Sequence, residues 1–309
     1  QRFGSAVALS DEQAFVSAIW EDVDGDSNQG VVYVFDGSGG EQDQRIVAPE
    51  GQGASLFGSA LAVDGGWLVI GAQLGTGGAY IYKLGESGWE FEQKILPDDL
   101  ASSAYFGHAV AILDDEIVGG AYADESGGKK CGSAYIYDRE DAGSWAEDDK
   151  FWPDPVVINE SFGISVGLME DQILVGNSYE SSNKGAVYRF EKYSGDWISQ
   201  AKLIGSASER LGTSVATSGN RAVFGAPANN AGQGAVYLHE LVDDQWSEGV
   251  KLQASDGAYN DWFGEYVGMT EDWILVGAPY AKNSSQVKTG AAYLFQTREA
   301  TCVPANGGM

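Results

Sequence analysis

Apolar and polar residues alternate along the chain in short runs that Gly, Asn, Asp and Ser interrupt, and these runs repeat. An alternation of period two, rich in β-branched and aromatic residues, predicts β-strands. A large apolar residue followed by Gly opens each repeat, at intervals of about 50 residues, a period typical of solenoids, propellers and arrays. The six openings are Phe3-Gly4, Phe57-Gly58, Phe106-Gly107, Phe162-Gly163, Leu211-Gly212 and Phe263-Gly264.

Four segments align within a repeat. The opening pair starts an alternating run, and a second apolar run ends in small residues, as in WLVIGA. The third segment follows the pattern G-x-[AV]-Y-x-[FYH]. The fourth places a basic residue beside an apolar one, as in Lys94-Ile95. It is the most polar segment, which is typical of an edge strand. We therefore expect an all-β fold, a β-propeller of six blades with four antiparallel strands each.

The predicted boundaries give a single propeller domain over residues 1–298, followed by a C-terminal tail at residues 299–309. The sixth repeat has no basic–apolar fourth segment after Gln296-Thr297-Arg298. Three alternatives stay open. The last blade has three strands, the tail from Glu299 to Met309 completes it, or residues outside this chain do so.

A formal net charge of −27 limits the kinds of molecule that the protein is expected to bind. Binding nucleic acid needs clustered Lys and Arg, so we expect no nucleic-acid ligand. No apolar run approaches 18 residues, so no direct membrane insertion is expected. No secretion signal precedes the first repeat, and a trimmed chain would also lack one. Cys131 and Cys302 lie in different repeats, so a disulfide between them is possible but not implied.

The repeat pattern FGxSVA…VGAP…GAVYxF…KLxASDGAxxDxFG resembles the FG-GAP family, the integrin α-subunit type of β-propeller. Its closest match is Val250–Pro279. The resemblance implies a secreted or cell-surface protein that binds ligands or partners, often with Ca²⁺ and usually without catalysis. In integrin-like blades the calcium loop joins strands one and two. Here those turns are as short as Asp114-Asp115, too few oxygens for six to eight ligands, so the family's calcium residues do not carry over to them.

A different loop has the spacing of a cation site. Asp22, Asp24, Asp26 and Asn28 place oxygen-bearing side chains at every second position. Alternate residues of a curled loop can point at one hard cation such as Ca²⁺. The loop joins strands two and three, and Ser27 stands where a turn favours Gly. A calcium site and a solvated acidic loop are equally supported.

The 2–3 loops and the connections from strand four to the next strand one emerge on the same side of a propeller. Aromatic residues recur there, with acids beside them. The predicted ligand face comprises Trp20, Tyr122, Asp124, Tyr179, Tyr280, Asp256, Asp261 and Trp262. Such rings can stack on sugars, or they can fill space between blades, and the second interpretation is the more common fate of aromatic residues.

Catalytic motifs are missing from the sequence. His108 and His239 fall in strand patterns, and no GxSxG, HExxH or phosphate-binding loop occurs. We expect a protein that is not an enzyme: an extracellular or cell-surface recognition or adhesion protein, with calcium as an assisting ion. Its partner would be a protein or glycan ligand at the cell surface or in the extracellular matrix. The alternatives are a carbohydrate-binding, lectin-like propeller and a structural subunit of a larger extracellular assembly.

Overall fold

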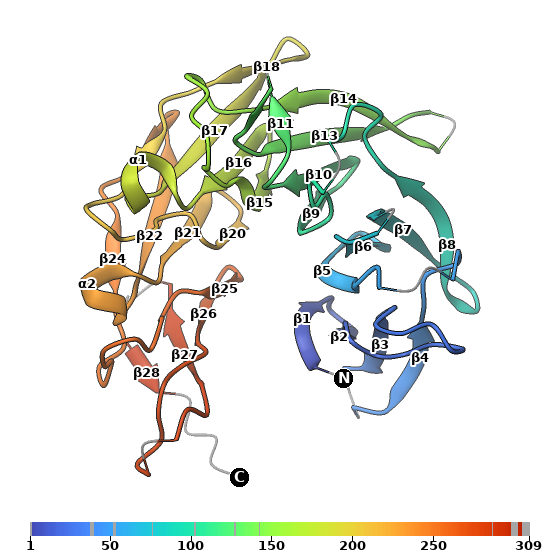
Figure 1. The fold of residues 1–309 in the computed structure, drawn as a ribbon, viewed down its shortest axis with the longest axis horizontal. Helices are drawn as coiled ribbons and strands as arrows, with labels where there is room; N and C mark the ends of the chain where they lie inside the picture. The colour runs from blue at the N-terminus through green and yellow to red at the C-terminus, as the bar shows by residue number, and fades with distance from the viewer. Residues whose placement is uncertain are drawn as a thin grey trace. The chain divides into compact units, whose positions relative to one another are not determined.

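The computed structural model describes residues 2–37, 40–51, 54–75, 77–101, 103–126, 128–141, 143–285, 287–297 and 302–304. The chain divides into two compact units, Gln1–Gly163 and Ile164–Met309. Each predicted repeat forms one antiparallel sheet, whose strands follow one another in chain order (Figure 1). The six sheets are the blades of an all-β propeller, as the repeat pattern predicts. That all six belong to one domain over residues 1–298 stays a prediction.

The first unit holds three blades and a small hairpin, β11–β12. The strands of its blades are β1 (Phe3–Leu9), β2 (Gln13–Ala18), β3 (Val31–Asp36) and β4 (Gln42–Ile46); β5 (Phe57–Asp64), β6 (Trp67–Ala72), β7 (Gly78–Gly85) and β8 (Gly88–Ile95); β9 (Ala109–Leu113), β10 (Glu116–Ala121), β13 (Ser133–Arg139) and β14 (Trp145–Phe151). The hairpin strands are β11 (Glu125–Ser126) and β12 (Lys129–Lys130).

The other three blades belong to the second unit, apart from the first two residues of β15, and in two of them the polar fourth strand is split. Their strands are β15 (Phe162–Met169), β16 (Gln172–Asn177), β17 (Ala186–Tyr193), β18 (Asp196–Ser199) and β19 (Leu203–Ile204); β20 (Val215–Ser218), β21 (Arg221–Ala226), β22 (Ala235–Val242), β23 (Gln245–Trp246) and β24 (Val250–Leu252); β25 (Tyr266–Met269), β26 (Trp273–Ala278), β27 (Ala291–Gln296) and β28 (Cys302–Pro304).

The last blade resolves part of the question that the sequence left open. It has three full strands, and the three-residue β28, from the predicted tail, pairs along β27 as a short fourth strand. Of the three alternatives, the structure therefore shows a blade of three full strands to which the backbone of the tail adds a short pairing.

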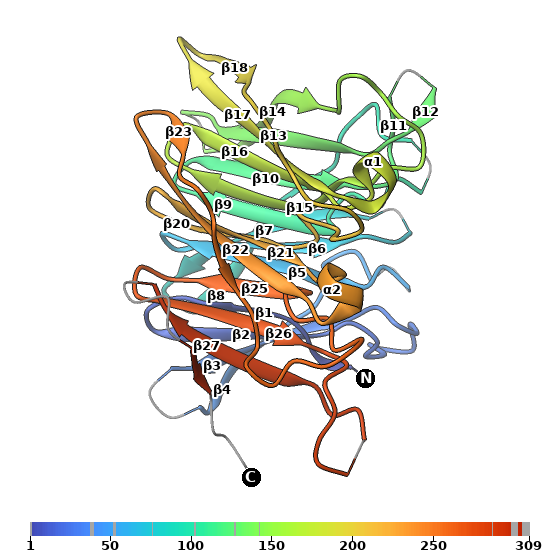
Figure 2. The same ribbon diagram turned by 90° about the vertical axis from the view of Figure 1, so that its left-hand side faces the viewer.

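The strand pattern predicts an all-β fold, but the part of the chain that the structure describes also contains two short helical turns. Single helical turns, α1 (Glu180–Asn183) and α2 (Asn229–Gly232), lie in two 2–3 loops. Figure 2 shows both at the same end of the strands of the second unit. Each turn is four residues long and has left-handed backbone in its middle, as at Ser181 (φ 50°) and Asn230 (φ 48°). A turn this short has no amphipathic period for a sequence pattern to detect.

The opening residues form the core between consecutive blades, as expected. Phe57 is fully buried among Val32 of the first blade and Ile70 of the second, and its ring meets Tyr80 edge-on at 5.4 Å. In the second unit Phe263 is buried against Val236 of the preceding blade in the same way. The exception is Phe3, which is 60% exposed.

Close backbone packing explains the Gly that begins the third segment. A Cβ at Gly132 would lie 2.0 Å from the carbonyl oxygen of Phe162, and one at Gly234 would lie 2.0 Å from that of Phe263. Both glycines also have left-handed backbone, at φ 86° and 88°. A side chain at either position would meet rigid backbone as well as conformational strain, so only Gly fits.

Candidate ligand-binding face

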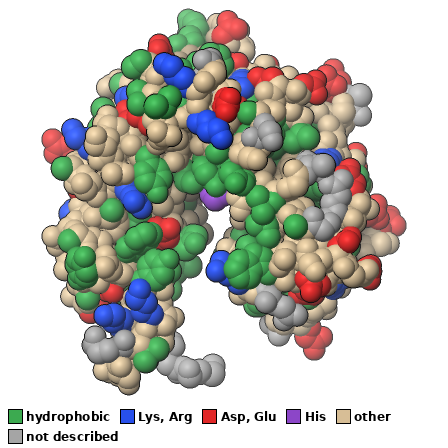
Figure 3. Space-filling view, viewed as in Figure 1, with side chains coloured by type: hydrophobic (Ala, Val, Ile, Leu, Met, Phe, Trp, Pro, Cys, Tyr) green, Lys and Arg blue, Asp and Glu red, His purple; other side chains and the backbone are tan. Residues whose placement is uncertain are grey.

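The 2–3 loops are tied by backbone hydrogen bonds to the connections that enter their own blades. In the first unit the Ala123 N–H donates to the Ala104 oxygen at 3.2 Å. In the second unit the Tyr280 N–H donates to the Asp261 oxygen, also at 3.2 Å. We call the surface that these loops and connections form in each unit its loop face. Figure 3 looks onto it and shows hydrophobic side chains next to lysines and arginines.

Left-handed backbone recurs on the loop face at the residue before the opening residue. The positions are Arg2 (φ 49°), Leu56 (φ 54°), Tyr105 (φ 60°), Arg210 (φ 56°) and Trp262 (φ 59°). Each carries a side chain where glycine would be easier by about 1 kcal/mol. Non-glycine residues held in this region cluster at functional sites. Of these five, the predicted face included only Trp262. The available sequence signal was the large residue directly before the opening pair.

In the first unit the loop face is closed by contacts between rings. Tyr105 and Tyr122 stack at a centroid distance of 5.2 Å with an interplanar angle of 5°. The His108 ring meets Tyr122 edge-on at 4.7 Å, and its Nδ1 lies 2.7 Å from the Gln73 Oε1. Trp20 is 41% exposed, with the guanidinium of Arg2 3.7 Å above its ring.

His108 corrects the expectation that both histidines lie inside strands. His108 lies one residue before β9 and belongs to the loop face, because the first strand of the third blade begins at Ala109, later than the repeat pattern suggests. Burial lowers the pKa of His108 to about 4. At neutral pH its ring is therefore uncharged. His239 does lie in a strand, β22, where its Nδ1 is 3.0 Å from the Ser247 oxygen.

In the second unit the rings are paired with cations. The guanidinium carbon of Arg210 lies 4.8 Å from the ring centre of Tyr179 and 5.9 Å from that of Trp262. Trp262 meets Tyr280 edge-on at 5.2 Å, and the Lys288 ammonium is 4.8 Å from the Tyr280 ring. These five residues form what we call the aromatic–cation cluster.

Asp124, one of the three predicted acids, lies inside its loop rather than on the surface. Asp124 is fully buried and accepts hydrogen bonds from the Ala101 N–H and the hydroxyls of Ser133 and Tyr135. Burial raises the pKa of Asp124, but these bonds and Lys150 more than offset that effect, so the pKa is lowered overall.

The other two predicted acids also hold the loops. Asp261 is 5% exposed and accepts from the Ala258 N–H at 2.7 Å. Asp256 is exposed, and one of its oxygens accepts from the Tyr293 hydroxyl at 2.9 Å. Asp261 therefore shapes its loop from within, whereas Asp256 lies at the surface and holds the Tyr293 hydroxyl.

The predicted calcium loop folds as a tight turn. The backbone groups of Val23 and Asp26 pair in both directions, around left-handed Asp24 and Gly25. The Asp22 Oδ1 accepts from the Asn28 N–H at 2.8 Å. Among the residues that the structure describes, no three His, Cys, Asp or Glu side chains converge to hold a metal ion. The loop as arranged does not fit a cation that needs six to eight oxygens, and calcium binding stays a prediction.

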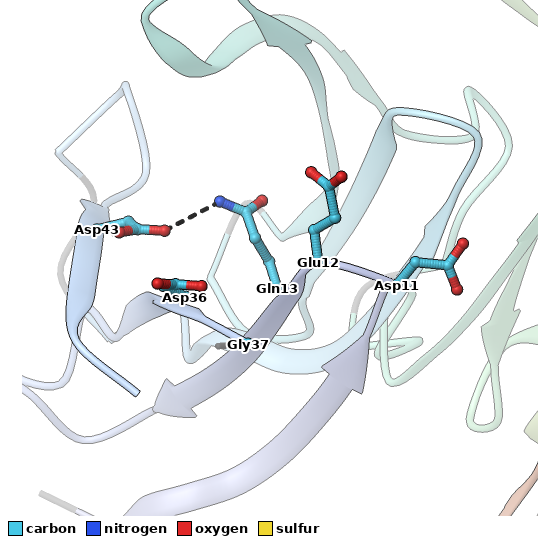
Figure 4. Close-up of a pocket in the computed structure, with 6 residues that line it drawn as sticks. All are labelled: Asp11, Glu12, Gln13, Asp36, Gly37 and Asp43. Carbon is cyan, nitrogen blue, oxygen red and sulfur yellow. Dashed lines mark hydrogen bonds between the residues drawn. The ribbon is translucent and has the colours of Figure 1, made fainter. Parts of the chain in front are cut away.

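A second acidic group lies at the opposite end of the first blade. Asp11, Glu12, Asp36 and Asp43 line a shallow hollow, where the Gln13 Nε2 donates to the Asp43 Oδ2 at 3.2 Å (Figure 4). The Asp11 carboxylate points away from the others. The arrangement is that of a solvated acidic edge.

Six antiparallel sheets that open on an apolar residue and Gly, locked blade to blade by glycines, define a β-propeller of the FG-GAP class. The FG-GAP repeat matches residues 1–35, 89–137, 197–239 and 246–295, more than half of the chain. The chain belongs to the FG-GAP repeat family. No curated protein matches it.

Membership of this family indicates which kinds of function the fold commonly serves. The fold is typical of ligand-binding propellers, and FG-GAP repeats often bind calcium. None of the helices in the described part of the chain has the length and hydropathy to cross a membrane.

Proposed function

We propose that the protein is an extracellular or cell-surface recognition propeller that binds a protein partner through its loop face. The observation that carries this proposal is the aromatic–cation cluster of the second unit. Tyr179 and Tyr280 are 40% and 41% exposed, and they stand on loops that backbone hydrogen bonds hold in place. Trp, Tyr and Arg are the residues that dominate binding energy at protein interfaces.

The proposal assigns binding rather than catalysis. The left-handed backbone before the opening pair recurs in five repeats, so the fold itself presents one side chain of each of these repeats at this point of the loop face. A rigid face also binds with little loss of conformational entropy, which favours affinity.

The test uses the full chain and a randomised twelve-residue peptide library displayed on phage. Enriched peptides, remade in solution, should bind the wild type, and Tyr280→Ala should weaken binding at least about tenfold, the loss of a strong interface contact. The matched control is Tyr193→Ala. Tyr193 is an exposed tyrosine of the same unit, at the end of β17 beside the turn that leads to β18.

Two results would contradict the proposal: no enrichment from the library, or equal losses for the two tyrosine variants. A parallel glycan array covers the lectin-like alternative, and sugar binding that Tyr280→Ala abolishes would favour it. Running each assay with calcium and with chelator tests the calcium prediction. Binding that survives chelation would remove calcium from the proposal.

A further inference from the structure

Arg210 and Arg2 differ from the other described arginines, because their side-chain contacts are with aromatic rings: Arg2 with Trp20, and Arg210 with two rings at once. Arg45, Arg139, Arg189 and Arg221 each donate to a carboxylate or carbonyl oxygen. Among the described residues, the contacts of the half-buried Arg210 guanidinium are the rings of Tyr179 and Trp262. A guanidinium has five N–H donors and keeps its charge, so this half-buried group has donors that an acceptor on a partner could use in place of water.

The backbone supports the same conclusion. Arg210 has φ 56°, and it is fixed there because its N–H donates to the Asn183 oxygen at 3.0 Å and its oxygen accepts from the Thr213 hydroxyl at 2.8 Å. The chain thus holds an arginine at a strained position, aimed at the loop face. Contacts with rings occupy none of the N–H donors with an acceptor, so the guanidinium can still form two parallel hydrogen bonds with a ligand.

A planar carboxylate matches such an edge, because the two parallel bonds of an arginine–carboxylate pair are among the strong charge-assisted ones. Lys288, above Tyr280, adds a second positive charge to the cluster. The acid that faces Arg210 from within the fold is Glu265, which interacts with it electrostatically but forms no ion pair with it in the described structure.

A neutral sugar fits this site less well. Sugars bind by stacking on open aromatic faces, whereas cations lie against the rings of Tyr179 and Tyr280. A polyanion is disfavoured by the net charge of −27, because each additional negative group meets a repulsive field. A single carboxylate on an otherwise apolar segment is attracted by Arg210 and Lys288 and meets the least repulsion from the net negative charge of the protein.

We infer that Arg210 binds a carboxylate side chain, an Asp or Glu, presented by a peptide segment of a protein partner between Tyr179 and Trp262. This inference rests on the proposed function and names the chemistry of the partner at that face.

The experiment uses the peptides that the wild-type full chain selects from the phage library. They should be enriched in Asp or Glu, and replacing that residue by Asn or Gln should weaken binding at least about tenfold. Arg210→Gln should weaken the acidic peptide to the same degree and remove its advantage over the amide peptide. Arg221→Gln removes the same charge elsewhere in the unit and should leave the advantage intact. Glu265→Gln should strengthen binding severalfold.

The inference fails, while the proposed function stands, when peptides bind the face without acidic enrichment or when Arg210→Gln still prefers the acidic peptide. Oligogalacturonate that binds in an Arg210-dependent way, without any acidic peptide that does so, would replace the peptide by an acidic glycan and overturn the inference. Failure of all peptides to bind sinks the proposed function itself and this inference with it. Unchanged thermal unfolding of Arg210→Gln shows that its losses are not losses of fold.

Discussion

The loop faces of the two units use the same repeat positions for different chemistry. The residue before the opening pair is Tyr105 in one unit and Trp262 in the other, and each packs against a tyrosine of its 2–3 loop at 5.2 Å. The residue after the opening pair is His108 in the first case and Glu265 in the second. The fold therefore fixes where the side chains lie, and the sequence at those points decides what the face can bind.

Burial acts on both of these titratable residues in the same sense. It lowers the pKa of His108 to about 4, and it raises the pKa of Glu265, which Arg210 partly offsets. Each group is shifted toward its neutral form, as expected of a charge taken out of water. The difference lies in what surrounds these two residues: His108 packs against the Tyr122 ring, whereas Glu265 interacts electrostatically with Arg210, whose guanidinium lies near two rings.

The largest effect should show that the scaffold is common to both units. Gly132→Ala and Gly234→Ala each place a Cβ against backbone at 2.0 Å, so each should lower the free energy of unfolding by about 3 kcal/mol or more. The control is Gly195→Ala, which has φ 94° and open space around it, and should cost about 1 kcal/mol. Urea unfolding of the full chain measures all three. Equal costs would show that the backbone contact is not the cause.

A smaller effect concerns the pH dependence of stability, to which His108 of the first unit and Glu265 of the second contribute in opposite senses. Between pH 6.5 and about 4 the unfolded chain protonates His108 and the folded chain does not, so stability falls as the pH falls. His108→Gln should remove that loss, about 2–3 kcal/mol. The folded Glu265 keeps its proton to a higher pH than its ordinary 4.5, so its contribution is lost as the pH rises through the folded pKa. Glu265→Gln should therefore stabilise the protein at pH 7.

The free energy of unfolding, measured across this pH range, should show that His108→Gln removes a loss of stability on the acid side, whereas Glu265→Gln removes a loss on the neutral side. If both variants changed the pH dependence of the free energy of unfolding in the same direction, burial would not control both groups.

The smallest effect concerns the left-handed residue of each loop face. Arg210→Gly relieves backbone strain while it removes the contacts with two rings, so the free energy of unfolding should change by less than about 1 kcal/mol. Tyr105→Gly loses a stacked ring as well, and should cost about 1 kcal/mol more. Thermal unfolding compares them. A large loss for Arg210→Gly would assign that arginine to stability instead of binding.

The strands of the fold follow directly from the sequence pattern. FGSAVAL, which starts the alternating run, is β1, and WLVIGA, a short continuous apolar run, is the fully buried strand β6. The tyrosine column and the basic fourth segment were also found, and they meet in the structure: the Lys202 ammonium lies 2.9 Å from the Tyr188 hydroxyl.

The binding face was harder to predict, because its features do not come from periodicity. Tyr179 and Tyr280 were identified because aromatic residues recur in the 2–3 loops, but Arg210 was not, since its place depends on a left-handed backbone angle that no alternation encodes. Asp124 was expected on the surface because acids usually are. It is buried because four donors converge on it from segments far apart in the sequence.

The glycine contacts between blades also bear on how such a chain could arise and be rearranged. The Phe57 N–H donates to the Gln29 oxygen of the preceding blade, and the Phe263 N–H donates to that of Gln233. A repeat excised at its opening residue would therefore expose unpaired backbone and an apolar seam at both cut ends. Recombination that copies or deletes blades must preserve the Gly of one repeat together with the opening residue of the next, so the heritable unit of this fold spans the joint between two blades.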